Sequence, residues 1–210
     1  MLFTYSLCMY KKNYKTKDMK QKIIAIIGQA GAGKDTVARL LSFSLGIPLI
    51  CSYTTRPMCE GEKNGREHIF VKECNIPREK MLAYTEYGGY EYWTELSQIE
   101  DTAIYVIDEK GIMDICERFP DIELVNIYVA AKPETLKARG ISPERMQRDE
   151  YRVTMDINSF DYVITNNSSL CALLHAVNAM SMQIKDYSQQ EPEISNQELS
   201  EYMKALLKDN

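Results

Sequence analysis

The chain has 210 residues, of which 45% are hydrophobic, and carries a formal net charge of −5. This length and composition predict one compact α/β unit, and the negative charge argues against general affinity for nucleic acid. The six cysteines show no CxxC pair and no spacing suited to zinc, so we expect reduced thiols and a cytoplasmic protein. No apolar run approaches the roughly 18 residues of a membrane span.

The first 20 residues precede the first strong strand signal. Their apolar stretch, Met1–Tyr10, is followed by lysines rather than preceded by them, which is the reverse of a secretory signal. We therefore expect residues 1–20 to be a disordered extension of a protein that is not exported, with Met19 as an alternative initiator.

A glycine-rich loop follows the apolar run Ile23–Ile27. Its sequence, GQAGAGK from Gly28 to Lys34, lets successive backbone N–H groups turn inward and form a nest for phosphate oxygens. Lys34 adds a charge for the outer phosphates, and the helical spacing of Thr36–Leu41 places them at a helix N-terminus. The alternative is a strand-to-helix turn without a ligand. The pattern predicts an ATP site formed by Gly28, Gly31, Ala32, Gly33, Lys34, Asp35 and Thr36.

Two positions are predicted to serve Mg²⁺. Asp35 stands where a serine or threonine usually binds the ion, so the hydroxyl of Thr36 is the expected ligand. Asp108 ends the apolar strand Ala103–Asp108, and in an open parallel sheet such strand ends face the ligand crevice. Its carboxylate therefore either holds a water bound to Mg²⁺ or caps the helix that follows.

A polar segment, Ser52–Pro57, combines hydroxyl groups with the guanidinium of Arg56. This set suits phosphate binding, with a polar turn as the alternative. Hairpin-like turn sequence follows at Glu60–Gly65, and Glu67–Val71 is predicted to be a strand returning from it.

The stretch from Ser52 to Phe70 resembles the substrate-binding segment of guanylate kinases. Where that family carries a second phosphate-binding arginine, this chain has Cys59, and where it carries a phosphate-binding tyrosine, this chain has His68. The resemblance implies that Ser52 and Arg56 hold the acceptor phosphate, with His68 in the place of the tyrosine. The matching residues are Ser52, Thr54, Thr55, Arg56, Gly61, Glu62, Gly65 and Phe70.

The segment Tyr87–Thr94 is similar to the strand that closes over the base in the same family. The likeness places Tyr92 at a phosphate-contacting tyrosine and Thr94 at a base-reading hydroxyl. It also gives Asp108 a role in reading the base, as an alternative to the metal and capping roles.

The likeness continues over residues 80–94, and two positions there depart from the family pattern. Ala83 stands where the glutamate that discriminates guanine from adenine falls, with Glu86 as the nearest acid, and Trp93 replaces a glycine. An aromatic cluster without a base contact is the alternative interpretation. The acceptor-binding residues implied by the likeness are Ser52, Arg56, His68, Tyr92, Thr94 and Asp108.

Four arginines flank the break Gly140–Pro143, after a helix opened by Pro133. They form either a solvated basic face or a lid that neutralises charge on a transferring phosphoryl group, and we favour a lid over residues 139–152. The family likeness fits Arg139 and Arg148 best to the lid positions, which implies a catalytic role for both, beside Lys34. The four are Arg139, Arg145, Arg148 and Arg152.

Phe160–Asn167 resembles the last core strand of the family, which places Asn166 on the adenine side of ATP. A helix starting at Ser168 closes the domain, and residues 189–193 form a polar linker. Asn196–Lys208 is a predicted amphipathic helix that docks either on the domain or on another subunit.

Alternating strands and helices around the phosphate loop predict a three-layer α/β fold with a parallel sheet flanked by helices. The resemblance implies a P-loop kinase domain over residues 21–188, with a region that binds a nucleoside monophosphate (NMP) inserted at 52–95, and a linker and helix at 189–210. It implies phosphorylation of GMP or dGMP by ATP with Mg²⁺, in a monomer or homodimer with neither nucleic-acid nor membrane partners. The alternatives are a kinase of another nucleotide or small phosphorylated acceptor, and a binding module without turnover.

Overall fold

Strand β1, Lys22–Gly28, is the centre of the fold. It runs parallel to β6, Thr102–Val106, on one side and to β7, Glu123–Ala130, on the other. Strand β8, Tyr162–Thr165, continues this sheet beyond β7, so the strand order is β6-β1-β7-β8. The computed structural model describes residues 20–66, 68–150 and 155–186.

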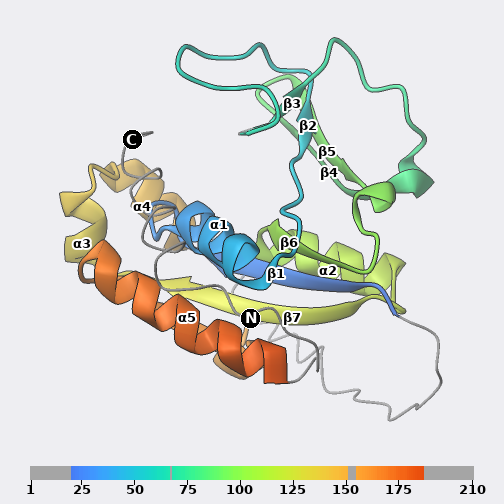
Figure 1. Ribbon diagram of the computed structural model, residues 1–210. Helices are drawn as coiled ribbons and strands as arrows, with labels where there is room; N and C mark the ends of the chain where they lie inside the picture. Colours follow the sequence, from blue (N-terminus) through green and yellow to red (C-terminus); the bar gives the residue numbers. More distant parts are fainter. Residues whose placement is uncertain (1–19, 67, 151–154, 187–210) are drawn as a thin grey trace, which may run out of the picture.

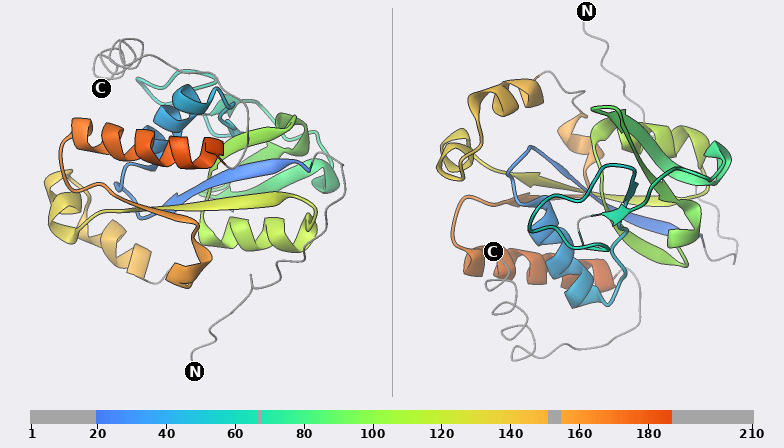
Figure 2. Two further views of the ribbon diagram at one scale, coloured as in Figure 1. Left: turned by 60° about the horizontal axis from the view of Figure 1, so that its bottom comes forward. Right: turned by 90° about the horizontal axis from the view of Figure 1, so that it is seen from above.

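Helices cover both faces of this sheet because alternate residues of β1 point to opposite sides. Ile24 and Ile26 pack in the cluster that includes α1, Lys34–Leu45, and α5, Leu170–Asp186. The alternate residues Ile23, Ala25 and Ile27 pack in the cluster that includes α2, Glu109–Arg118, on the opposite face (Figure 2). A strand buried on both faces has to be apolar throughout, as this one is. The predicted three-layer α/β fold is thus confirmed.

The remaining helices are short. Helix α3, Pro133–Ala138, and helix α4, Pro143–Glu150, lie at the carboxyl end of the sheet (Figure 1). Single turns of 3-10 helix occur at Arg78–Lys80 (η1), Leu96–Gln98 (η2) and Ile157–Ser159 (η3).

A second, smaller sheet lies to one side of the main sheet (Figure 1). Its strands β4 and β5 form an antiparallel hairpin around Gly88 and Gly89. Strand β3 pairs with β2 in parallel, so the prediction of a strand returning through a hairpin was wrong. A parallel neighbour requires a crossover, and the loop between β2 and β3 supplies it. The strands are β2 (Tyr53–Thr54), β3 (Ile69–Phe70), β4 (Met81–Tyr87) and β5 (Tyr90–Glu95), in the order β3-β2-β5-β4.

Four predicted features lie outside the described residues: residues 1–19 of the extension, Arg152 in the lid, the linker at 189–193 and the helix at 196–208. Within the described part of the chain, no helix combines the length and the apolar character needed to cross a bilayer.

Candidate active site

The glycine-rich loop connects β1 to α1. Gly33 is the N-cap of α1, in a left-handed conformation with φ 96°, and Lys34 is the first helical residue. A Cβ on Gly28 would overlap the carbonyl oxygen of Val129 on β7, and a Cβ on Gly33 would overlap Asn166 Nδ2. The loop therefore needs glycine at both positions, for its backbone angles and for its close neighbours.

Two of the predicted site residues brace this loop from the strand end of β8 and from the lid. Asn166, which is buried, donates from Nδ2 to the carbonyl of Ala32 at 2.8 Å. Arg139 donates to the carbonyls of Gly31 at 2.9 Å, Ala32 at 3.3 Å and Asn166 at 2.9 Å. In the trans peptide that follows Ala32, the N–H belongs to Gly33 and points away from Asn166. Asn166 and Arg139 thus hold loop carbonyls on one side of the loop backbone, and the N–H of Gly33 faces the other side.

The charged and hydroxyl groups at the start of α1 are arranged around the same loop. Lys34 lines a cavity, and its Nζ donates to the carbonyl of Gln29 at 3.0 Å. Asp35 is exposed and Thr36 is half-buried in the first helical turn. The ammonium group is therefore held at the outer edge of the loop, and the Thr36 hydroxyl is one helical position from the usual place of a metal-binding residue.

Helix α4 of the lid reaches the loop through a residue that the sequence did not single out. The N–H of Ala30 donates to Oδ2 of Asp149 at 2.7 Å. Arg148, predicted to be catalytic, precedes Asp149 on α4, but its side chain lies outside the described part of the structure. No pattern could have predicted the Asp149 contact, because it joins residues that are 119 positions apart.

On the acceptor side, Ser52, His68 and Tyr92 come together. Ser52 Oγ lies 2.7 Å from His68 Nδ1, and the His68 ring contacts the Tyr92 ring edge-on with centroids 5.6 Å apart. Ser52 and Tyr92 also line the cavity that contains Lys34. The structure therefore brings together three of the residues assigned to the acceptor phosphate.

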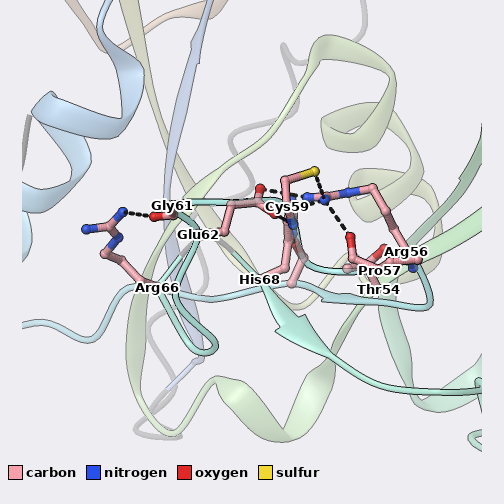
Figure 3. A network of polar contacts seen from close by, with 9 residues as sticks. Thr54, Arg56, Pro57, Cys59, Gly61, Glu62, Arg66 and His68 are labelled. Atoms are coloured by element: carbon pink, nitrogen blue, oxygen red, sulfur yellow. Dashed lines mark hydrogen bonds and ion pairs between the residues drawn. The ribbon is translucent and has the colours of Figure 1, made fainter.

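The fourth, Arg56, is held beside them by an ion pair within the β2–β3 loop (Figure 3). Its guanidinium donates to both carboxylate oxygens of Glu62, at 2.9 and 2.8 Å, and lies over the Phe70 ring. Cys59, which replaces the family's second arginine, contributes an Sγ that lies 3.0 Å from Arg56 Nη1, and its N–H donates to Glu62. The pKa of Arg56 is raised above its ordinary value, chiefly by the hydrogen bonds to Glu62.

The base-reading residues implied by the likeness are Thr94, which lies behind the cavity wall, and Asp108, which lines the cavity. Thr94 is fully buried, and its hydroxyl donates to the hydroxyl of Tyr105 at 3.2 Å. Tyr105 lines the cavity, and burial raises its pKa to about 12, so it stays a neutral donor and acceptor. Asp108 also lines the cavity and caps α2, accepting from the N–H of Gly111 at 2.8 Å. Tyr105 was missed at the sequence level, although it lies on the strand that leads to Asp108.

The departures from the family pattern also face this region. Ala83 lines the cavity and is the cross-strand partner of Thr94. Glu86 is exposed, and it accepts from the hydroxyl of Tyr84 at 2.6 Å. Trp93 is buried and stacks on Tyr53 with centroids 5.5 Å apart. The position where an acid would read guanine is therefore apolar.

One cavity of about 1030 Å³ connects these groups. Lys34 and Asp149 line it near the glycine-rich loop, and Ser52, Tyr92 and Ala83 line it in the inserted region. A concave site with a few convergent polar groups is the usual form of a ligand site, and this one extends from the glycine-rich loop to residues predicted to hold the acceptor phosphate.

Several known proteins are similar to this chain in sequence or in fold. The family model for guanylate kinase matches residues 20–183. A guanylate kinase of Neisseria gonorrhoeae is 33% identical over 183 residues, covering 76% of this chain and 88% of that protein. One of Prochlorococcus marinus is 29% identical over 168 residues, covering 71% and 91% respectively. A crystal structure of guanylate kinase from Anaplasma phagocytophilum has the same fold, with a TM-score of 0.55 at 20% identity over 81% of this chain and 88% of that one. The chain belongs to the guanylate kinase family.

Proposed function

We propose that this protein transfers the γ-phosphoryl group of ATP to a nucleoside monophosphate, with GMP or dGMP as the acceptor. The observation that carries the proposal is the shared cavity, in which Lys34 on the phosphate loop, Ser52 just before β2 and Tyr92 on β5 face the same space. Phosphoryl transfer needs two phosphate sites in one enclosed volume, since positioning and charge stabilisation account for most of the catalysis.

On the donor side, the loop N–H groups bind the phosphates and Lys34 balances their negative charge. Lys34 leaves its bond to the Gln29 carbonyl and turns to the outer phosphates, while Asn166 and Arg139 keep the loop backbone in place. Arg139 thus contributes in two ways. It holds the loop backbone in place, and it adds a positive charge beside the loop. Arg148 remains proposed as a second lid cation that stabilises charge on the moving group.

The residues expected to hold Mg²⁺ fit an ion that prefers oxygen ligands. Thr36 offers a hydroxyl in the first turn of α1, and Asp108 offers a carboxylate on the cavity wall. Asp108 uses Oδ1 for the N–H of Gly111, and since a carboxylate accepts at both oxygens, capping and holding a magnesium-bound water are compatible. The ion, when bound, would neutralise charge between the outer phosphates.

On the acceptor side, Ser52, Arg56, His68 and Tyr92 orient the phosphate that attacks. Arg56 is already fixed by Glu62, so little side-chain entropy is lost when its remaining N–H groups bind phosphate. Tyr105, held by the Thr94 hydroxyl behind it, and Asp108 form the polar part of the base pocket.

A coupled assay that measures ADP production from Mg·ATP with each common ribo- and deoxynucleoside monophosphate tests the proposal. We expect the highest kcat/KM with GMP or dGMP, and the absence of turnover with every acceptor would refute a kinase function. Lys34→Ala should lower kcat by about 10²–10³ because it removes a positioned charge from the transition state. The matched control is Lys137→Ala, on the exposed side of α3, which should keep the wild-type rate.

A different acceptor base is the second candidate, favoured by Ala83 on the cavity wall. An apolar residue there leaves the N1–H and N2–H₂ groups of guanine without an acceptor. Guanine therefore loses more binding free energy than a purine that lacks the amino group. Under this reading the assay shows turnover of AMP or another NMP at a rate similar to GMP. Ala83→Glu should then shift the preference toward GMP.

A further inference from the structure

The peptide group between Gln29 and Ala30 lies between two opposite charges. Its carbonyl oxygen accepts from the ammonium of Lys34 at 3.0 Å, and its N–H donates to the carboxylate of Asp149 at 2.7 Å. The negative end of the peptide dipole thus faces the cation and the positive end faces the anion, so both contacts are charge-assisted. Both side chains also line the cavity.

This N–H belongs to the outer part of the phosphate nest. Lys34 is the group that reaches the outer phosphates of a nucleotide bound at such a loop, and it is bonded here to the same peptide as Asp149. A carboxylate and a phosphate oxygen cannot share one N–H, and two anions at contact distance disfavour each other. The Asp149 contact and an outer phosphate at this N–H therefore exclude each other.

A second contact brings the lid onto the loop at the adjacent residue. A Cβ on Gly31 would overlap the side chain of Ile141, so the beginning of the lid packs directly on the loop. Arg139, from the same segment, donates to the Gly31 carbonyl. The lid is thus held on the loop from Arg139 to Asp149, at the end of α4.

We propose that Asp149 is an internal stand-in for the outer phosphate of the donor, and that a bound triphosphate displaces it and releases Lys34 at the same time. Asp149 therefore lowers the affinity for ATP and couples donor binding to movement of α4. The inference rests on the ATP site of the proposed function, and it concerns only the phosphate end of that site.

Isothermal titration of the full chain with Mg·ATP tests it. Asp149→Asn keeps the size of the side chain and removes its charge, so we expect ATP to bind roughly tenfold more tightly, the effect of removing one competing charge-assisted hydrogen bond. Glu144→Gln makes the same charge change in the first turn of α4 and should leave the affinity unchanged. An Asp149→Asn affinity equal to or weaker than that of the wild type overturns the inference.

Inorganic tripolyphosphate separates this inference from the proposed function. It carries the anion without the nucleoside, so its affinity should rise by the same factor in Asp149→Asn. If tripolyphosphate shows that gain while no NMP is phosphorylated, the proposed function fails and the inference stands. If NMPs are phosphorylated and neither ATP nor tripolyphosphate gains affinity, the inference alone is wrong.

A measurement without any ligand checks the contact itself. Asp149→Ala removes the acceptor of the Ala30 N–H, so amide hydrogen exchange at Ala30, followed by NMR, should become at least several-fold faster than in the wild type. Glu144→Ala should leave that rate unchanged. Equal exchange rates in the wild type and Asp149→Ala would show that the carboxylate does not hold the loop.

Discussion

Ser52 and His68 join the residues that directly precede β2 and β3, with Ser52 Oγ 2.7 Å from His68 Nδ1. The imidazole also contacts the edge of Tyr92, so its ring lies between two other residues assigned to the acceptor phosphate. A histidine that only filled the loop would not need partners from both the segment before β2 and strand β5. The arrangement favours a role for His68 in acceptor binding.

Replacing His68 with phenylalanine tests that role. The aromatic contacts with Phe70 and Tyr92 would be kept, but the hydrogen bond with Ser52 and any bond to phosphate would be lost. We expect the KM for the acceptor to rise about tenfold, with the KM for ATP unchanged, as determined by steady-state kinetics. His175, exposed on α5, provides the control, and its replacement by phenylalanine should change neither constant. An unchanged acceptor KM in His68→Phe would limit His68 to a structural role.

Arg56 should not tolerate lysine. Its guanidinium is fixed by two hydrogen bonds to Glu62 and by the Phe70 ring, a geometry that a single ammonium group cannot reproduce. We expect Arg56→Lys to lower kcat/KM for the acceptor by about 10- to 100-fold, which corresponds to about 1.5–3 kcal/mol. Arg66→Lys, in the same loop, where the guanidinium donates to the carbonyl of Gly61 at 3.4 Å, should lower it less than twofold. Equal effects of the two substitutions would mean that Arg56 does not bind the acceptor.

The Arg56–Glu62 pair gives stability a defined dependence on pH. The pKa of Glu62 is lowered from 4.5 to about 2, first by the hydrogen bonds from Arg56 and then by the Cys59 N–H. Between about pH 2 and pH 4.5 the unfolded chain binds more protons than the folded chain. The stabilisation from the Arg56–Glu62 pair is therefore complete above the unfolded pKa and is lost as the pH falls toward 2.

Glu62→Gln removes this titration. The difference in unfolding free energy between wild type and variant should be constant from about pH 7 to about pH 5 and should shrink at lower pH. Urea denaturation at a series of pH values measures it. A difference that stays constant through the acidic range would contradict the assigned cause of the shift.

The central parts of the fold could be predicted because their signals are local. The apolar run of β1, the glycines after it and the helical spacing of α1 lie within about 20 consecutive residues, and each follows from backbone chemistry at its own position. The direction of β3 could not be predicted, since a two-residue strand takes its orientation from the sheet partners it meets.

The candidate site likewise has residues that a sequence pattern predicts and contacts that it does not. Ser52, Arg56 and Tyr92 could be assigned from a family pattern, and the structure brings them together. Asp108 was left with several roles at the sequence level, of which capping is the one seen in the described residues. The contact of Asp149 depends on where α4 is placed in space, which no local pattern encodes.

Two glycines with similar backbone angles provide a test of the phosphate loop. Gly33 and Gly46 both have positive φ, at 96° and 68°, at the two ends of α1. A Cβ on Gly46 meets nothing within 4 Å, so Gly46→Ala should cost only the left-handed strain, about 1 kcal/mol. A Cβ on Gly33 displaces Asn166 from the carbonyl of Ala32, which adds the loss of a buried hydrogen bond.

We therefore expect Gly33→Ala to lower the free energy of unfolding by about 2–4 kcal/mol and to weaken ATP binding at least tenfold. Gly46→Ala should leave the affinity for ATP unchanged, because its strain lies at the far end of the helix. Urea denaturation and ATP titration of both variants provide the two readouts. Equal losses of stability and affinity in the two variants would contradict a specific role for the packing of Asn166 against the loop, because left-handed strain is the only change that the two variants share.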